Sequence, residues 1–154
     1  EILLVASSGK SIRFHESDVR PMGRGAAGVR GIKLAPDHEV IALTKIRDGL
    51  ILTATENGYG KRTSVSDFPL QGRGGQGVIA IQTSERNGRT VGAALVGDGD
   101  EIMLISSNGT LVRTGVDDIS IQGRNTQGVR LIRVGSEQRL VGLARIESIE
   151  EDEE

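Results

Sequence analysis

The sequence contains no cysteine and no tryptophan, and its aromatic residues are only Phe14, Tyr59 and Phe68. The missing thiols exclude disulfide scaffolds, thiolate zinc sites and cysteine nucleophiles. With two histidines, a multi-histidine metal centre is also disfavoured. No apolar run approaches the roughly 20 residues that cross a bilayer as a helix. The chemistry of this chain must therefore rest mainly on charged side chains and the backbone.

Glycine and arginine are the abundant residues. There are 22 glycines against three prolines, which is typical of a chain with many tight turns. Arginine provides 15 of the 19 basic residues. The net charge of −2 conceals an acidic run at 150–154, without which the chain has 19 basic and 16 acidic side chains. Charge therefore does not exclude an anionic partner. Because the sequence starts at Glu1, we expect it to be part of a longer chain.

The sequence repeats three times with a period of about 50 residues. Gly9, Gly58 and Gly109 each end a Ser/Asn-Gly turn and align with one another. The segments GRGAAGVRGI, GRGGQGVIAI and GRNTQGVRLI align at the same spacings. The repeat predicts three units, followed by an acidic tail at 149–154. The units cover residues 1–48, 49–100 and 101–148.

Each unit is predicted to hold four short strands. Two apolar or mixed runs flank the turn, as in a β-hairpin. A third strand is predicted to start at Val29, Val78 and Val129, and a fourth to cover 39–46, 90–96 and 139–146. Residues 137–148 also fit an amphipathic helix, but the two strand-like copies favour a strand. Four antiparallel strands per unit are typical of a propeller blade, so the predicted fold is all-β.

Two glycine motifs, at 23–28 and 72–77, match the G-x-G-x-x-G pattern of dinucleotide-binding loops. That fingerprint requires a following helix, whereas a β-like run follows here, so we expect no cofactor. No nucleophile–base pair or set of metal ligands recurs among the units. We therefore expect no catalytic site, no metal and no small-molecule substrate in these residues.

Two aligned columns hold arginine in all three units. They are Arg13, Arg62 and Arg113, and Arg24, Arg73 and Arg124. The guanidinium fork binds phosphate oxygens in pairs, and one fork per blade would form a basic stripe around a rim. The scarcity of stacking aromatics disfavours single strands and favours duplex DNA. The alternative is that these arginines are solvated strand residues in scattered ion pairs. The predicted DNA-binding residues are Arg13, Arg24, Arg30, Lys61, Arg62, Arg73, Arg113, Arg124 and Arg130.

The runs ILTATENGYGKRT and RNTQGVRLIR, together with the threefold repeat, resemble the C-terminal domain of the A subunit of bacterial DNA gyrase. The resemblance implies a six-bladed β-pinwheel, in which a strand of each blade pairs with a neighbouring blade. This chain would supply about the last three blades. It also implies non-specific duplex DNA binding, bending and wrapping within an ATP-dependent type IIA topoisomerase that introduces negative supercoils. The implied partners are DNA, the gyrase B subunit, and the rest of the A subunit, in the cytoplasm and without a membrane.

The heptad that marks this family, Q-R-R-G-G-K-G, has a degenerate copy at 71–77. The matching positions are Gln71, Arg73, Gly74, Gly75 and Gly77. Gly72 and Gln76 replace an arginine and a lysine, and the full heptad is expected upstream of this chain. Two alternatives stay open: the equivalent domain of topoisomerase IV, in its own A subunit, or a propeller that serves as a protein-interaction platform.

Overall fold

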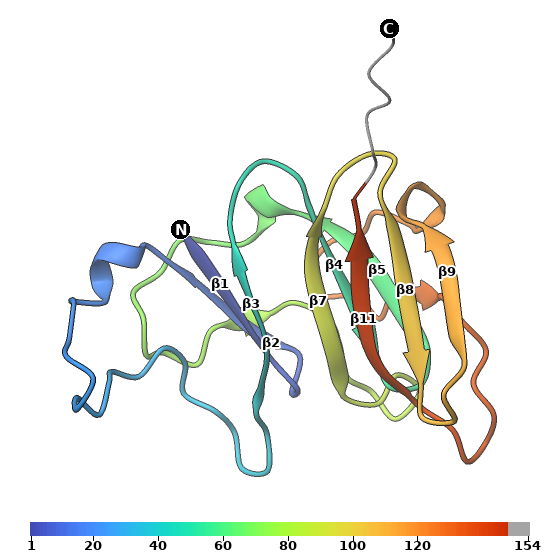
Figure 1. The fold of residues 1–154 in the computed structure, drawn as a ribbon, viewed down its shortest axis with the longest axis horizontal. Helices are drawn as coiled ribbons and strands as arrows, with labels where there is room; N and C mark the ends of the chain where they lie inside the picture. Colours follow the sequence, from blue (N-terminus) through green and yellow to red (C-terminus); the bar gives the residue numbers. More distant parts are fainter. Residues whose placement is uncertain (148–154) are drawn as a thin grey trace, which may run out of the picture.

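The computed structural model describes residues 1–147, which form three antiparallel sheets side by side (Figure 1). The first sheet has the order β3 (Val40–Lys45), β1 (Ile2–Ala6), β2 (Lys10–Phe14) and β6 (Val78–Ile79). The second has the order β10 (Val129–Arg130), β5 (Tyr59–Ser64), β4 (Leu50–Thr55) and β7 (Thr90–Val96). The third has the order β11 (Leu140–Ile146), β8 (Glu101–Ser106) and β9 (Leu111–Gly115). The predicted all-β fold is confirmed.

Neighbouring units exchange a short strand. β6 belongs in sequence to the second unit but pairs with β2 of the first, placing Val78 opposite Ser11. β10 belongs to the third unit but pairs with β5 of the second, placing Val129 opposite Gly60. The pairing between neighbouring blades that the resemblance implies is therefore present at both junctions. At the other edge of the sheets, β7 packs beside both β3 and β11.

One expectation about the strands is wrong: no strand starts at Val29, and 19–39 contain no strand. A two-residue strand such as β6 forms only by pairing with the sheet of the preceding unit, and no described unit precedes the first. The third unit has its four predicted strands, but β10 pairs with the second sheet, so the third sheet holds three strands among the described residues. At 140–146 the structure has the strand β11, which confirms the strand prediction over the helix.

Two of the three buried clusters lie between adjacent sheets, and the third lies within the first unit. Strand residues alternate between two faces, so Leu3 and Val5 point toward the second sheet, where they meet Ile51 and Phe68. The next layer forms between the second and third sheets, around Leu52, Ala54, Ile102, Leu104 and Leu140. Burying each large apolar side chain contributes about 1.5–3 kcal/mol. The hydrophobic layers therefore hold the units together as well as forming each one.

A short 3-10 helix follows the second strand of each unit. These helices are η1 (Glu16–Asp18), η2 (Val65–Asp67) and η3 (Val116–Asp118). Their carbonyls matter for the basic side chains described below. Within residues 1–147 the structure has no helix that is long and apolar enough to cross a membrane.

Candidate nucleic-acid interface

The first arginine column joins each sheet to the unit that follows it. Arg13, on β2, donates from Nη1 to the carbonyls of Val65 and Phe68, both at 3.0 Å. Arg62, on β5, donates from Nε to the carbonyl of Ile119 at 2.7 Å. These acceptors lie at the 3-10 helices η2 and η3 of the next unit. The column therefore links units, and its contact with DNA stays a prediction.

The third member of that column has a different environment. The side chain of Arg113 is 60% exposed, against 9% for Arg62. Arg113 forms an ion pair with Glu101 on the neighbouring strand of its own sheet. No unit follows it within residues 1–147, so the carbonyls that would receive its guanidinium are absent from the described part of the chain.

The second arginine column links each unit to the one before it. Arg73 donates from Nε to the carbonyl of Asp18 at 3.0 Å and from Nη1 to that of Arg30 at 3.1 Å. Arg124 makes the same two bonds one unit later, at 2.6 and 2.9 Å. Arg24, in the first unit, is exposed and makes no such bond among the described residues.

Lys61 is the deepest basic residue, with no exposed surface. Its ammonium group donates to four oxygens of the loop at 123–126 in the next unit. They are the carbonyls of Gly123, Arg124 and Thr126 at 2.6, 2.6 and 3.2 Å and the hydroxyl of Thr126 at 2.9 Å. Burial, and then the charge of Arg124, lower the pKa of Lys61 to about 8. Lys61 thus links β5 to the loop at 123–126 through these hydrogen bonds.

The prediction that Lys61 and Arg62 lie on an exposed rim is wrong, because both are buried. The sequence held a signal for Lys61. Its column contains Ile12 and Val112 in the other two units, and an apolar column in a repeat indicates a position that faces the core. No comparable signal existed for Arg62, whose column holds only arginine.

The degenerate heptad at 71–77 forms the loop that crosses from the second unit to the first. The Gln71 N–H donates to the carbonyl of Arg13 at 2.7 Å, and the Gly75 carbonyl accepts from the Lys33 N–H at 2.8 Å. Gly77 has φ +75°, and a Cβ there would lie 2.0 Å from the Ser11 carbonyl oxygen. Backbone contacts therefore hold this loop, and glycine is required where it approaches β2.

A cluster of two arginines on a tyrosine marks the outer surface of the second junction. The guanidinium of Arg86 lies 4.1 Å from the centre of the Tyr59 ring, and that of Arg130 lies 5.3 Å away. Arg130 also donates to the Tyr59 hydroxyl at 2.7 Å. The hydrogen bond from Arg130, and then the one from Arg86, lower the pKa of Tyr59 below its ordinary value. Repeat analysis missed Arg86 because the aligned residues, Asp37 and Glu137, are acidic.

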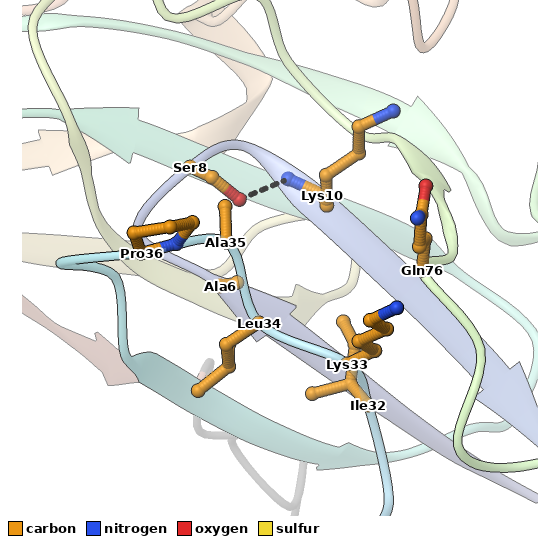
Figure 2. Close-up of a pocket in the computed structure, with 9 residues that line it drawn as sticks. All are labelled: Ala6, Ser8, Lys10, Ile32, Lys33, Leu34, Ala35, Pro36 and Gln76. Atoms are coloured by element: carbon orange, nitrogen blue, oxygen red, sulfur yellow. Dashed lines mark hydrogen bonds between the residues drawn. The ribbon is translucent and has the colours of Figure 1, made fainter.

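An apolar pocket of about 360 Å³ lies beside β2 of the first sheet (Figure 2). Lys10, Lys33 and Gln76 line one part of it, and Ile32 and Leu34 lie among its apolar residues. Two of its lining residues, Ser8 and Lys10, align in the repeat with Asn57 and Tyr59, which lie beside the two arginines. Arg30, three residues before Lys33, is also exposed. We call this residue and the basic residues at the two places the outer cations: Lys10, Arg30, Lys33, Arg86 and Arg130.

The outer cations form no ion pair with any carboxylate of residues 1–147. Their charge is therefore available to an external anion, and guanidinium groups bind phosphate oxygens in pairs. Among residues 1–147, no three His, Asp or Glu side chains are grouped so that they could hold a metal ion. The arrangement suits electrostatic binding of a polyanion that follows the outer strands from one unit to the next.

Comparison with known proteins agrees with this architecture. The family model described as "DNA gyrase C-terminal domain, beta-propeller" matches residues 1–47, 49–96 and 100–147. The DNA gyrase A subunit of Pseudomonas aeruginosa is 56% identical over 148 residues, covering 96% of this chain and 16% of that protein. The Salmonella typhimurium protein is 54% identical over 155 residues, covering 100% of this chain and 18% of that protein. The chain thus spans less than a fifth of these relatives.

Two solved structures have the same fold. The structure of the DNA gyrase A C-terminal domain matches with a TM-score of 0.86 and 28% identity, covering 94% of this chain and 50% of that one. The C-terminal domain of DNA topoisomerase IV matches with a TM-score of 0.88 and 25% identity, covering 95% and 46%. Fold similarity does not separate the two, whereas the identity of more than half to the gyrase relatives favours gyrase. Since three successive matches of the family model account for nearly all of residues 1–147, the chain belongs to the DNA gyrase C-terminal domain family of β-propellers.

Proposed function

We propose that this chain binds duplex DNA without sequence preference, through phosphate contacts made by the outer cations. The observation that carries the proposal is the placement of five basic side chains, without carboxylate partners among residues 1–147, near the outer strands of the first and second sheets. Phosphate contacts supply affinity but carry no sequence information. The DNA must follow the row of sheets to touch both junctions, so binding and bending are coupled.

The chemistry of the outer surface favours duplex over single-stranded DNA. Proteins that bind single strands stack bases on exposed aromatic rings. Of the three aromatic residues, Phe14 and Phe68 are buried, and Arg86 lies over the ring of Tyr59. No aromatic face is therefore free to stack a base within residues 1–147. The remaining affinity comes from charge, which the closely spaced phosphates of a duplex exploit best.

The role in the longer protein is part of the same proposal. By its similarity to the DNA gyrase A protein, the chain would act with the remainder of that protein and with the gyrase B protein, in the bacterial cytoplasm at the nucleoid. That enzyme is an ATP-dependent topoisomerase that introduces negative supercoils, and we assign this chain its DNA wrapping and no catalytic step. The equivalent domain of topoisomerase IV is the second candidate, supported by the fold match at 25% identity.

The test compares two double variants that remove the same charge. Arg86→Ala with Arg130→Ala removes two outer cations, and Lys45→Ala with Arg47→Ala removes two exposed cations at and just after β3, the strand at the opposite edge of its sheet. Affinity for a duplex is measured by fluorescence titration at several salt concentrations and on two unrelated sequences. Log K falls as log salt rises, and each lost phosphate contact makes this slope less steep by about 0.9. The slope of the outer variant should therefore be less steep than that of the wild type by about 2 on both sequences. The control should keep the wild-type slope.

Equal loss in both double variants would mean that net charge, and not the outer surface, governs binding, and would contradict the proposal. Bending is measured separately by ligating nicked circles in the presence of the chain and counting the change in linking number. Three units should bind and bend DNA but shift the linking number less than an intact gyrase C-terminal domain does. A shift per bound protein as large as that of the intact domain would contradict this division of the wrapping surface.

A further inference from the structure

The second junction carries a group of three side chains that the repeat does not reproduce. Tyr59 is on β5, Arg130 is on β10, and Arg86 is in the loop before β7. Tyr59 and Arg130 lie opposite each other where β10 pairs with β5. At the first junction the corresponding pair is Lys10 and Ile79, which provides neither an aromatic ring nor a guanidinium. The group is therefore a property of one junction, at a contact between the second and third units within the chain.

Tyr59 contacts the two arginines in different ways. The Arg86 guanidinium lies 4.1 Å from the centre of the ring, which is within the range of a cation–π contact. The Arg130 guanidinium lies farther from the ring and donates from Nη2 to the hydroxyl at 2.7 Å. The ring is only 9% exposed, whereas both arginines are exposed. Tyr59 is thus the fixed member of the group, and the arginines rest against it.

Arg86 is also held from the third unit. Its Nη1 donates to Oε1 of Gln127 at 2.9 Å, and its backbone carbonyl accepts from the side-chain amide of Asn57 at 3.1 Å. The Gln127 carbonyl in turn accepts from Nδ2 of Asn87, a fully buried residue, at 2.7 Å. A series of hydrogen bonds therefore runs from the interior to the exposed guanidinium. A side chain that is ordered in advance loses less conformational freedom when it binds a ligand.

The group favours a negative charge beside it. No carboxylate of residues 1–147 forms an ion pair with Arg86 or Arg130, so two positive charges surround one ring. The lowered pKa of Tyr59, caused first by the hydrogen bond from Arg130 and then by the one from Arg86, has the same origin. A hollow of about 240 Å³ opens beside the group, and Ser136 and Gln138 also line it. An anion with several oxygens, such as a backbone phosphate, suits these donors.

We propose that Tyr59 is a positioning residue for DNA binding, whose ring and hydroxyl hold Arg86 and Arg130 so that both guanidiniums bind the duplex backbone at one place. This role rests on the proposed DNA binding and adds to it a residue that contributes no charge of its own. The alternative is that Tyr59 only packs the junction and that the two arginines bind independently of it. The two roles differ in what the loss of the ring does to DNA affinity.

The test separates the position of the two charges from their number. Tyr59→Leu keeps both arginines, so the slope of log K against log salt should stay that of the wild type. Its Kd for a duplex should rise on the order of tenfold, because two freed side chains must then be ordered on binding. Arg86→Ala with Arg130→Ala should instead make the slope less steep. All affinities are measured by fluorescence titration of a labelled duplex at several salt concentrations.

Two further variants separate positioning from stability. Tyr59→Phe keeps the ring and removes the hydroxyl, so it should restore most of the affinity that Tyr59→Leu loses. Phe68→Leu is the matched control, because it replaces another buried aromatic residue, in the cluster between the first and second sheets. It should leave the Kd unchanged, and thermal unfolding by circular dichroism checks that each variant is folded during the titration. Wild-type affinity in Tyr59→Leu, or an equal loss in Phe68→Leu, would overturn the proposal.

A spectroscopic test needs no variant, because Tyr59 is the only tyrosine of the chain. Isotopic labelling of the tyrosine Cζ gives one NMR signal, from the atom that carries the hydroxyl. This signal should shift as a short duplex is added and should saturate together with binding, because phosphates then engage the guanidiniums that contact the ring. A signal that stays fixed while the duplex is fully bound would contradict the role of Tyr59 alone. A wild-type Kd and slope in the double arginine variant would contradict the proposed DNA interface itself.

Discussion

At the scale of single residues, a cation surrounded by backbone carbonyls holds chain segments together without an acidic partner. Arg73 and Arg124 do so at the two junctions, and Lys61 does so from a fully buried position. Hydrogen bonds to charged groups contribute about 1.5–3 kcal/mol each, more than neutral ones. Burial of the ammonium opposes this gain, so the protonation state of Lys61 affects stability.

The buried ammonium predicts a pH dependence with a defined sign. The pKa of Lys61 is about 8 in the folded chain and about 10.4 when unfolded. Between these values the unfolded state binds more protons, so the free energy of unfolding should rise with pH in that window and stay flat below it. Measured by urea denaturation from pH 7 to 10, the wild type should gain on the order of 2 kcal/mol relative to Lys61→Met. Parallel pH curves for the two proteins would contradict the assignment.

The sequence predicted which basic residues recur but not what they contact. One arginine per unit is expected whether the column binds DNA or links units, because both roles repeat once per blade. Only the structure shows that the donors of Arg62 face the carbonyl of Ile119. Arg86 escaped prediction for the opposite reason, since it occurs in one unit alone.

At the scale of elements, the hairpin turns are where one unit touches the next. Gly9, Gly58 and Gly109 all have φ between +84° and +89°, as tight turns of this type require. A Cβ on Gly9 or Gly58 would lie 2.3 or 2.2 Å from a carbonyl oxygen of the following unit, whereas one on Gly109 would meet nothing within 4 Å. The same turn is therefore crowded at two places and open at the third.

This contrast separates backbone strain from crowding. Gly109→Ala should cost only the left-handed conformation, about 1–2 kcal/mol. Gly58→Ala should cost the same amount plus about 1–3 kcal/mol for displacing the backbone at Ile132. Urea denaturation of both variants gives the difference directly. Equal losses of unfolding free energy in the two variants would show that the backbone at Ile132 moves to accommodate the new methyl group without an energetic cost.

The strands themselves were largely predictable because their apolar runs and Asn-Gly or Ser-Gly turns are local signals. The pairing of β6 and β10 with the preceding unit was predicted only from the family resemblance. A two-residue strand is too short to show the alternation of apolar and polar residues that predicts a strand. The strand prediction at Val29 failed because the Gly-Val pair at 28–29 is the same as those at 77–78 and 128–129. Strand pairing depends on a neighbouring sheet and not on the local sequence alone.

At the scale of the whole molecule, charge is divided between the body and the end of the sequence. The acidic residues 150–154 turn a body of 19 basic and 16 acidic side chains into a chain of net charge −2. The predicted tail at 149–154 lies outside the described residues. Its effect on a polyanion depends on ionic strength, because exposed charges act over the Debye length.

Deleting Glu150–Glu154 should tighten duplex binding at low salt, because five carboxylates compete with phosphates for the same cations. The gain should shrink as salt rises and the Debye length falls from about 30 Å at 0.01 M to about 8 Å at 0.15 M. Replacing the five residues by Gln keeps the length and serves as the charge control. Unchanged affinity at low salt for both variants would mean that the tail does not influence binding.

The exchanged strands also determine the order in which the units can be completed during translation. The first sheet has its own three strands once β3 has emerged from the ribosome, but its outer strand, β6, is made later. Ser11 and Val78 are 67 residues apart, an interval of roughly 3 to 13 s at 5–20 residues per second. Lys61 likewise stays without its four oxygen partners until Thr126 has been added, 65 residues on. The first and second nascent units therefore each present an open edge to the chain still being made, and that edge is closed by the unit that follows.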